Sequence, residues 1–225
     1  MRCLWIGGWG IPTIHIEALA RRYFPQMEHR CVPPKRDWIT ALNGTFTHLA
    51  GYSLGAFLIL KDQNMRAVFG NPLTLFAPFL DFKREAKIGG RIATSRLKLL
   101  HRQLRCRPLE ALGNFYSAAG LGLQSPQKLP YSLEDLVWGI EMLLEESVSP
   151  EAFENTLSFV GACDPLLDAE TLHSHLPNLE IIPGAQHCLE SLIHHHCRQD
   201  PNNCKCSRPS RLYSNRSHCT RRSQT

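Results

Sequence analysis

The sequence predicts an α/β fold, in which a mostly parallel sheet of about six strands is flanked by helices and interrupted by a helical insertion. Within residues 1–80, short apolar runs alternate with stretches of helical periodicity. Residues 81–155 keep the helical periodicity but carry no strand signal, and the alternation resumes within residues 156–197. Strands that alternate with helices favour a parallel sheet covered on both faces. We therefore expect a core made of residues 1–80 and 156–197, with residues 81–155 as a helical cap, here called the cap segment.

Residues 1–80 are expected to hold four strands and the helices that connect them. Pro25 ends the first helical stretch and Asn43-Gly44 ends the second, because proline and glycine interrupt regular structure. The run 54–60 is apolar on nearly all sides, which is typical of a helix packed deep against a sheet. The expected strands are Cys3–Ile6, Cys31–Val32, Thr45–Tyr52 and Leu73–Ala77, and the expected helices span 16–23, 38–42 and 54–60.

The cap segment contains three runs of helical periodicity. The first is strongly basic, the second covers residues 109–116, and the third begins at a capping box formed by Ser132 and Asp135. The apolar stripe of the first run is made of Ile92, Leu97, Leu100 and Leu104.

The strand and helix pattern returns after residue 155 and is lost again near residue 197. The expected strands are Thr156–Gly161 and Leu179–Ile182, and the expected helices span 168–176 and 188 to about 195. Residues 198–225 carry seven Lys/Arg against one acidic residue and few apolar side chains, so we expect a disordered basic tail rich in Cys, Ser and Arg. A nucleic-acid role for this tail would rest on its charge alone, and we expect none.

The stretch Gly51-Tyr52-Ser53-Leu54-Gly55 has the pattern G-x-S-x-G at the junction of an expected strand and an expected helix. Glycines two positions before and after the serine allow a sharp turn that exposes the Ser53 hydroxyl near the positive end of the helix. A serine in that place can act as an acyl-enzyme nucleophile. The alternative is a strand–helix turn with an ordinary serine, because a short pattern recurs by chance.

An acid and a histidine follow the later strands in a suggestive order. Asp164 ends the strand that precedes it, and His187 follows the last strand. Since the carboxyl ends of parallel strands share one edge of a sheet, Ser53, Asp164 and His187 are expected to meet there as a catalytic triad. Asp164 could instead be a turn residue and His187 a plain loop histidine. Asp168 is the second choice for the acid, although we place it one helical turn into the next element.

The loop after the first strand, Gly8-Trp9-Gly10, is the fourth part of the predicted site. In a sheet of this kind that loop supplies one N–H to an oxyanion hole, and the residue after the nucleophile supplies the other. Those donors are Trp9 and Leu54. The alternative for Trp9 is a surface aromatic residue in a glycine turn.

From Leu4 to about Ile193 the chain resembles the α/β-hydrolases, and within them the pimeloyl-[acyl-carrier protein] methyl ester esterases of biotin synthesis. The family has a longer sheet, whose usual first two strands we do not find here, and it has no counterpart of the tail. The residues that carry the resemblance are Gly8-Trp9-Gly10, Gly51-Tyr52-Ser53-Leu54-Gly55, Asp164 and Gly184-Ala185-Gln186-His187.

The resemblance implies a substrate and a mode of binding. It implies a serine carboxylesterase that hydrolyses the methyl ester of pimeloyl-acyl carrier protein without any cofactor. The stretch 109–116 resembles the helix that lines the acyl site of that family, which makes Phe115 and Tyr116 candidate substrate-binding residues. A general short-chain carboxylesterase or thioesterase shares the same triad, and a catalytically inactive hydrolase-fold binding protein remains a further alternative.

The cap segment also carries a dense group of basic residues. Acyl-carrier proteins are acidic, so a basic helix over the active-site mouth would suit such a partner. The alternative is the solvated outer face of an amphipathic helix. The candidate docking residues are Arg91, Arg96, Lys98 and Arg102.

Composition and cysteine spacing bear on membrane insertion, secretion, cellular compartment and metal binding. The net charge of +5 comes from the tail, and no apolar run reaches the 18 or more residues of a membrane span, nor is a secretory signal expected. The scattered cysteines of the core suggest reduced thiols and a cytoplasmic protein, for which we expect a monomer. The spacing of the cysteines and histidines around residues 194–206 fits no structural zinc pattern, so we expect no metal.

Overall fold

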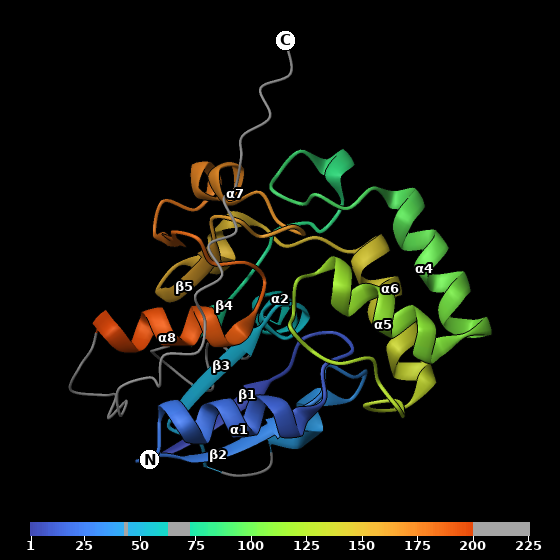
Figure 1. Ribbon diagram of the computed structural model, residues 1–225. Helices are drawn as coiled ribbons and strands as arrows, with labels where there is room; N and C mark the ends of the chain where they lie inside the picture. Colours follow the sequence, from blue (N-terminus) through green and yellow to red (C-terminus); the bar gives the residue numbers. More distant parts are fainter. Residues whose placement is uncertain (43–44, 63–72, 200–225) are drawn as a thin grey trace.

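The computed structural model describes residues 1–42, 45–62 and 73–199 of the 225-residue chain. Within these residues, six strands form a single sheet in the order β2-β1-β3-β4-β5-β6, and every neighbouring pair is parallel (Figure 1). This arrangement confirms the predicted fold class. The strands are β1 Arg2–Ile6, β2 Glu28–Val32, β3 His48–Tyr52, β4 Leu73–Phe76, β5 Thr156–Gly161 and β6 Leu179–Ile182.

The strand order contains a point at which the path of the chain reverses. The chain passes from β1 to β2 on one side, then returns to place β3 on the other side of β1. Loops that leave the carboxyl ends of two such strands diverge and leave a crevice, which is where parallel α/β sheets bind their ligands. The loops that follow β1 and β3 contain Trp9 and Ser53.

Helices cover both faces of the sheet. In Figure 1, α1 and α8 lie side by side in front of the strands and α2 lies behind them, and the rings of Tyr23 in α1 and His194 in α8 are in contact. Residues 54–60 of α2 are all buried, as their apolar sequence predicted. The helices around the sheet are α1 Thr13–Tyr23, η1 Trp38–Leu42, α2 Leu54–Lys61, α7 Ala169–His175 and α8 Leu189–Gln199, of which η1 is a 3-10 helix.

The last helix is longer than predicted. We expected it to end near His195 and the tail to begin at residue 198, yet α8 continues to Gln199 and buries Cys197. Cys197 lies four residues after Ile193 on the apolar side of α8, so the helical period extends past the three consecutive histidines. The rest of the predicted tail, residues 200–225, lies outside the described part of the chain.

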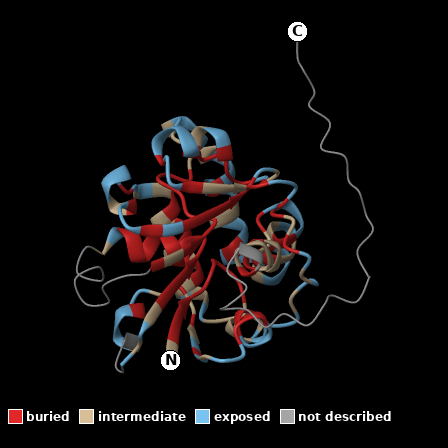
Figure 2. Ribbon diagram, turned by 90° about the vertical axis from the view of Figure 1, so that its left-hand side faces the viewer, coloured by how far each residue is buried: buried red, intermediate tan, exposed pale blue. Residues whose placement is uncertain are grey.

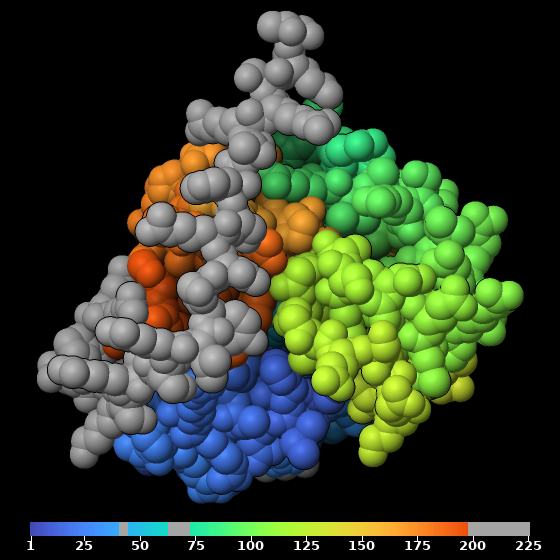
Figure 3. Space-filling view, viewed as in Figure 1, coloured from blue at the N-terminus to red at the C-terminus, as the bar shows by residue number. Residues whose placement is uncertain are grey.

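Residues 81–155 contain helices and no strand of the sheet. Figure 3 shows this cap segment as a green and yellow lobe beside the rest of the molecule. Leu97 and Leu104 are buried where α4 packs against α5 and α6, and the backbone N–H of Asp135 donates to the Ser132 hydroxyl at 3.1 Å, which confirms the predicted cap of α6. The elements are η2 Arg84–Ala86, α4 Thr94–Cys106, α5 Pro108–Ala118, α6 Leu133–Glu145 and η3 Pro150–Phe153.

The buried apolar residues form one cluster that joins the sheet to the cap segment. Leu75 of β4 and Leu112 of α5 both belong to it. Figure 2 shows the strands buried and the outward faces of the helices exposed. Among the described residues no helix has the length and apolar character that a membrane crossing needs. None of the cysteines in the same part of the chain is in a disulfide.

Candidate active site

Ser53 lies at a sharp turn between β3 and α2. Its backbone has φ 52° and ψ −116°, a conformation that few non-glycine residues adopt. The Ser53 N–H donates to the carbonyl of Phe76 at 2.8 Å, and its carbonyl accepts from Phe57 N at 3.0 Å. These bonds tie the strained residue to the neighbouring strand and to the first turn of the helix. The side chain is thereby held beyond the end of the strand, as the sequence pattern predicted.

The two glycines of the pattern are required by close packing. A Cβ on Gly51 would lie 2.6 Å from the Cα of Ala56, and a Cβ on Gly55 would overlap the carbonyl oxygen of Ile6. Gly55 therefore lets α2 approach the end of β1, and Gly51 lets the helix fold back on its own strand. This approach brings the N-terminus of α2 next to the loop that contains Trp9.

The structure brings Ser53, His187 and Asp164 together in one hydrogen-bonded chain. His187 Nε2 lies 2.9 Å from Ser53 Oγ, and His187 Nδ1 lies 2.7 Å from Asp164 Oδ2. All three side chains are buried. An ionised carboxylate only accepts hydrogen bonds, so Nδ1 carries the ring proton and Nε2 is left to accept the serine proton. This is the geometry in which a histidine can act as a general base toward a serine hydroxyl.

One oxygen of the Asp164 carboxylate is bound by the loop that follows it. Its Oδ1 accepts from the backbone N–H of Leu166 at 2.8 Å and of Leu167 at 3.1 Å, which leaves Oδ2 for His187. These bonds orient the carboxylate within the buried site and stabilise its charge.

Asp168, the second choice for the acid of the predicted triad, is bonded to other residues than His187. It is the N-cap residue of α7, where its Oδ1 accepts from Thr171 N at 3.0 Å, and its Oδ2 accepts from Arg91 at 3.2 Å. It precedes α7 instead of lying one turn inside it. The reason is that Asp at an N-cap satisfies a free N–H of the first helical turn.

Tyr52, the residue before Ser53, contacts His187 in a way that the sequence pattern did not predict. Its hydroxyl donates to the backbone carbonyl of His187 at 2.7 Å. Burial, with Cys188 and Asp164 nearby, raises the pKa of Tyr52 well above its ordinary value, so the hydroxyl stays protonated and remains a donor. The only sequence signal for this contact was the position of Tyr52 inside the G-x-S-x-G motif.

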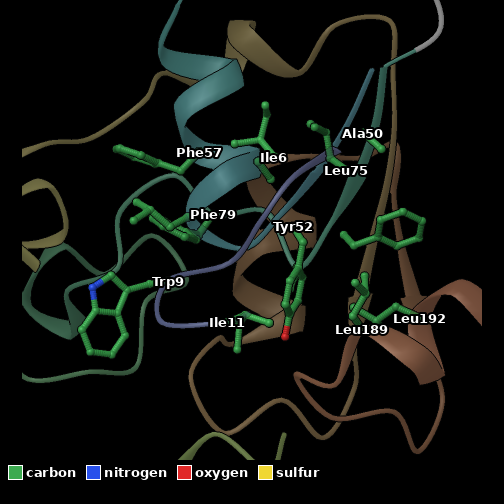
Figure 4. Packing of buried hydrophobic residues seen from close by; sticks show 14 of the residues in the cluster. Ile6, Trp9, Ile11, Ala50, Tyr52, Phe57, Leu75, Phe79, Leu189 and Leu192 are labelled. Carbon is green, nitrogen blue, oxygen red and sulfur yellow. The ribbon is translucent and has the colours of Figure 1, made fainter. Parts of the chain in front are cut away.

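Trp9 lies in the loop after β1, and its side chain belongs to the buried apolar cluster drawn in Figure 4. Its backbone N–H, and that of Leu54, have no backbone acceptor within the residues that the structure describes. Both residues line the same cavity as Ser53. The two N–H groups are thus available in the way that the predicted oxyanion hole requires.

Three contacts from the cap segment hold the loop that contains Trp9. The indole Nε1 of Trp9 donates to the carbonyl of Leu136 at 2.8 Å. The N–H of Gly10 donates to the hydroxyl of Tyr131 at 2.7 Å, and the carbonyl of Gly10 accepts from the hydroxyl of Tyr116 at 2.5 Å. Both backbone polar groups of Gly10, the residue that follows Trp9, are therefore bound by tyrosine hydroxyls, of which that of Tyr131 was not predicted from the sequence.

A cavity of about 220 Å³ opens beside Ser53, between the sheet and the cap segment. It is larger than the roughly 150 Å³ apolar cavity that accommodates benzene, so a short acyl chain fits. Phe115 lines the cavity and packs edge-on against Trp9, with their ring centroids 4.8 Å apart. Most of the lining is apolar: Trp9, Leu54, Phe82, Ile92, Leu97, Leu99, Leu100, Ala111, Phe115, Ala118, Ile140, Leu143 and Leu166, with Arg96, Gln103 and Asn114 as polar members.

Tyr116 does not line this cavity, in contrast to the expectation that it contacts substrate. It is buried, and its hydroxyl contacts Gly10 instead. Neighbouring positions of a helix point in directions about 100° apart, and here Phe115 points into the cavity while Tyr116 points toward the loop that contains Trp9. Tyr116 contributes to the site through the backbone of the loop that contains Trp9.

The four candidate docking residues do not form one group. Arg96, Lys98 and Arg102 are exposed on α4, and Arg96 also lines the cavity. Arg91 precedes α4, and its guanidinium donates to the backbone carbonyl of Asp164 at 2.9 Å and to the Asp168 carboxylate. The expectation of a single helix that carries all four is therefore wrong for Arg91.

The described residues contain no cluster of three or more His, Cys, Asp or Glu side chains that could hold a metal ion. Within the histidine run of α8, His196 packs against the ring of Phe159 and His195 contacts Glu180 at 2.6 Å. Cys204 and Cys206 lie outside the described part of the chain.

The chain has the α/β-hydrolase fold: a parallel sheet, a strained serine at the turn after β3, and an acid and a histidine after later strands. No protein-family model matches the sequence, and no curated protein matches it at the level of sequence.

Several solved structures share this fold at low sequence identity. A thermophilic esterase from Thermogutta terrifontis superposes with a TM-score of 0.59 at 13% identity, over 90% of this chain and 88% of the esterase. An N-acyl homoserine lactonase bound to N-hexanoyl homoserine lactone has a TM-score of 0.58 at 13% identity, covering 89% of both chains. An epoxide hydrolase from Bacillus megaterium has a TM-score of 0.58 at 14% identity, covering 90% of both chains.

Proposed function

We propose that this protein is a serine hydrolase of carboxylic esters, with Ser53 as nucleophile, His187 as general base and Asp164 as the acid of the triad. The observation that carries the proposal is the continuous hydrogen-bonded chain from Asp164 through His187 to Ser53, which ends at an apolar cavity. An esterase and a lactonase are among the proteins with a similar fold, which agrees with chemistry at an acyl carbonyl.

In the first step, Ser53 Oγ attacks the ester carbonyl while His187 Nε2 takes the hydroxyl proton. The carbonyl oxygen gains negative charge, which the N–H groups of Trp9 and Leu54 stabilise. The tetrahedral intermediate expels the alcohol, which leaves with the proton from His187. The product of this step is an acyl ester of Ser53.

In the second step, water attacks the acyl ester of Ser53. His187 takes a proton from the water and then returns it to Ser53 Oγ as the acid is released. Asp164 stays ionised throughout and stabilises the imidazolium that forms in both steps. The chemistry is complete with this chain's own side chains and water, so the proposed reaction requires no cofactor.

For the acyl group, the cavity supports a short or medium apolar chain. Within that class we propose the methyl ester of pimeloyl-acyl carrier protein as the physiological substrate, on the basis of the sequence resemblance around Trp9, Ser53 and His187. The exposed Arg96, Lys98 and Arg102 on α4 offer a basic surface for an acidic carrier. Biotin synthesis in the cytoplasm is the pathway that follows from this substrate.

The reaction class is tested by labelling and by hydrolysis. A fluorophosphonate probe should label the wild-type protein at Ser53, and p-nitrophenyl butyrate should be hydrolysed. The Ser53→Ala variant should be neither labelled nor able to hydrolyse the ester. The His187→Ala variant should keep the fold but lose ester hydrolysis. A folded wild-type protein that is neither labelled nor active would contradict the esterase proposal and support the inactive binding protein.

The substrate is tested separately. Growth of a biotin-auxotrophic strain that lacks its pimeloyl ester esterase should be restored by the wild-type gene and not by Ser53→Ala. Esterase activity without growth would favour the general carboxylesterase, and preferential hydrolysis of acyl thioesters would favour the thioesterase. Arg96→Glu combined with Arg102→Glu should slow turnover of the carrier-bound ester but not of p-nitrophenyl acetate, and equal rates would exclude a docking role.

A further inference from the structure

Residues 89–91, at the start of the cap segment, run antiparallel to the loop that carries Asp164. The N–H of Arg91 donates to the carbonyl of Leu166 at 3.0 Å, and the N–H of Asp168 donates to the carbonyl of Gly89 at 2.7 Å. Gly90 and Leu167 form the antiparallel bridge between these two bonds. The loop 164–168 is thus bound along its length by a segment that does not belong to the sheet.

The side chain of Arg91 spans the same loop from one end to the other. Its Nη1 donates to the backbone carbonyl of Asp164 at 2.9 Å, and its Nη2 donates to Asp168 Oδ2 at 3.2 Å. A guanidinium group is planar and presents its donors at fixed angles, so the two bonds set the separation of the two loop residues. A lysine ammonium has no such fork.

The conformation of this loop decides where the triad carboxylate points. Two of the three hydrogen bonds to the Asp164 carboxylate come from Leu166 and Leu167, within the loop itself. A shift of the loop would therefore move Oδ2 relative to His187 Nδ1. Errors of about 1 Å in the placement of a catalytic group can cost roughly a hundredfold in rate.

From these contacts we infer that Arg91 is a positioning residue for the triad: it holds the loop 164–168 so that Asp164 Oδ2 meets His187. It acts on the reaction through Asp164 and does not touch substrate. The inference rests on the proposed ester hydrolysis, and it connects the cap segment directly to the acid of the triad.

The test compares Arg91→Ala, Arg91→Lys and the matched control Arg84→Ala, which removes an exposed arginine of the same segment. With p-nitrophenyl butyrate, Arg91→Ala should lower kcat by about tenfold and leave KM within about twofold. Added guanidinium ion should restore part of the Arg91→Ala rate. Arg91→Lys should be intermediate, and Arg84→Ala should match the wild type.

A spectroscopic measurement tests the positioning without substrate. The Nδ1 proton of His187, bonded to Asp164, should give a low-field proton resonance that is absent in His187→Ala. Arg91→Ala should shift or broaden this resonance, whereas Arg84→Ala should not. A purely structural role for Arg91 would lower stability and leave the resonance of the folded protein unchanged.

The outcomes separate this inference from the proposed function. Wild-type kcat in Arg91→Ala, or a reduced kcat with an unchanged resonance and no response to guanidinium, would overturn it. If the wild type hydrolyses no ester, the proposed function fails and the resonance alone decides the inference. If Arg91→Ala does not fold, Arg91→Lys decides: a reduced kcat with a shifted resonance supports the inference, and wild-type values of both overturn it.

Discussion

The hydroxyl of Tyr52 donates a hydrogen bond of 2.7 Å to the backbone carbonyl of His187, 135 residues away in the sequence. The residue next to Ser53 thus holds the loop that contains His187. The rings of the two residues also lie close, with centroids 5.6 Å apart. Serine and histidine are therefore connected twice, once through their side chains and once through Tyr52.

Tyr52→Phe should lower kcat by about fivefold while KM stays nearly constant. The His187 loop loses the hydrogen bond from the Tyr52 hydroxyl, so the hydrogen bond between Ser53 and His187 lengthens. The unpaired carbonyl should also lower the free energy of unfolding by about 1 kcal/mol. Steady-state kinetics and urea unfolding measure the two effects. Tyr23→Phe, which removes a hydroxyl that contacts Glu190 at 3.3 Å, is the control and should leave kcat unchanged.

Gly55→Ala should destabilise the protein by about 3 kcal/mol, because the new methyl group would overlap the backbone carbonyl of Ile6, which cannot move aside. Thermal or urea unfolding measures the loss. Gly113→Ala is the matched control: it lies within α5, its nearest neighbour would be the Ser125 hydroxyl at 3.3 Å, and alanine favours a helix. Equal stability of the two variants would contradict the packing argument.

Tyr116→Phe and Tyr131→Phe should each lower kcat by about tenfold with little change in KM, since a loosened Gly10 peptide misplaces the Trp9 N–H in the transition state. Affinity for a boronic acid that mimics the tetrahedral intermediate should fall in parallel. Burial raises the pKa of Tyr116 to about 12, so its hydroxyl donates at neutral pH. A rise in KM at constant kcat would instead assign Tyr116 to substrate binding.

Phe115→Ala should enlarge the cavity beside Trp9 and shift the acyl preference toward longer chains. The ratio of kcat/KM for p-nitrophenyl octanoate to that for the butyrate should rise by about threefold or more, because extra methylene groups gain apolar contacts. Leu109→Ala, at an exposed position of the same helix, should leave the ratio unchanged. An unaltered ratio in Phe115→Ala would show that the acyl chain lies elsewhere.

Asp168→Asn should lower stability at neutral pH but not in acid. Burial alone would raise the pKa of Asp168, but hydrogen bonds from Thr171 and Arg91 outweigh it and hold the pKa below its ordinary value of 3.8. Ionised Asp168 therefore stabilises the fold above that pH, and the contribution is lost as the pH falls through the lower folded-state pKa. Asparagine keeps the N-cap acceptor and removes the charge together with the oxygen that accepts from Arg91.

At pH 7 the wild type should exceed Asp168→Asn in free energy of unfolding by about 0.5 kcal/mol, because the ion pair with Arg91 is partly exposed. The difference should be smaller at pH 3, since the contribution of Asp168 begins to fade once the pH falls below 3.8. Urea unfolding at both pH values measures the difference. A difference of the same size in acid would mean that shape, and not charge, stabilises this loop.

The local sequence pattern was sufficient to predict the parts of the site that depend on backbone geometry. The period of the apolar residues located the strands, and Gly51 and Gly55 predicted the turn at Ser53, since few residues tolerate such close approach. Parallel strands direct their carboxyl ends to one edge, so chain order alone predicted that Asp164 and His187 would lie near Ser53.

Two predictions from the sequence pattern were wrong, because the spacing of neighbouring residues does not show which distant group a side chain contacts. Spacing could not tell that Tyr116 points to Gly10 while Phe115 lines the cavity. It also grouped Arg91 with the basic residues of α4, because charge density does not reveal which arginine has a partner.

The fold class, the turn at Ser53 and the order of Ser53, Asp164 and His187 along the strand ends could be predicted from the sequence, because each follows from backbone geometry over a few neighbouring positions. The three-dimensional structure was needed to show that Tyr52 supports His187, that Tyr116 and Tyr131 hold Gly10, and that Arg91 binds the loop of Asp164. These contacts join residues that are 73 to 135 positions apart, and they depend on side-chain directions that are set only when distant segments of the chain pack together.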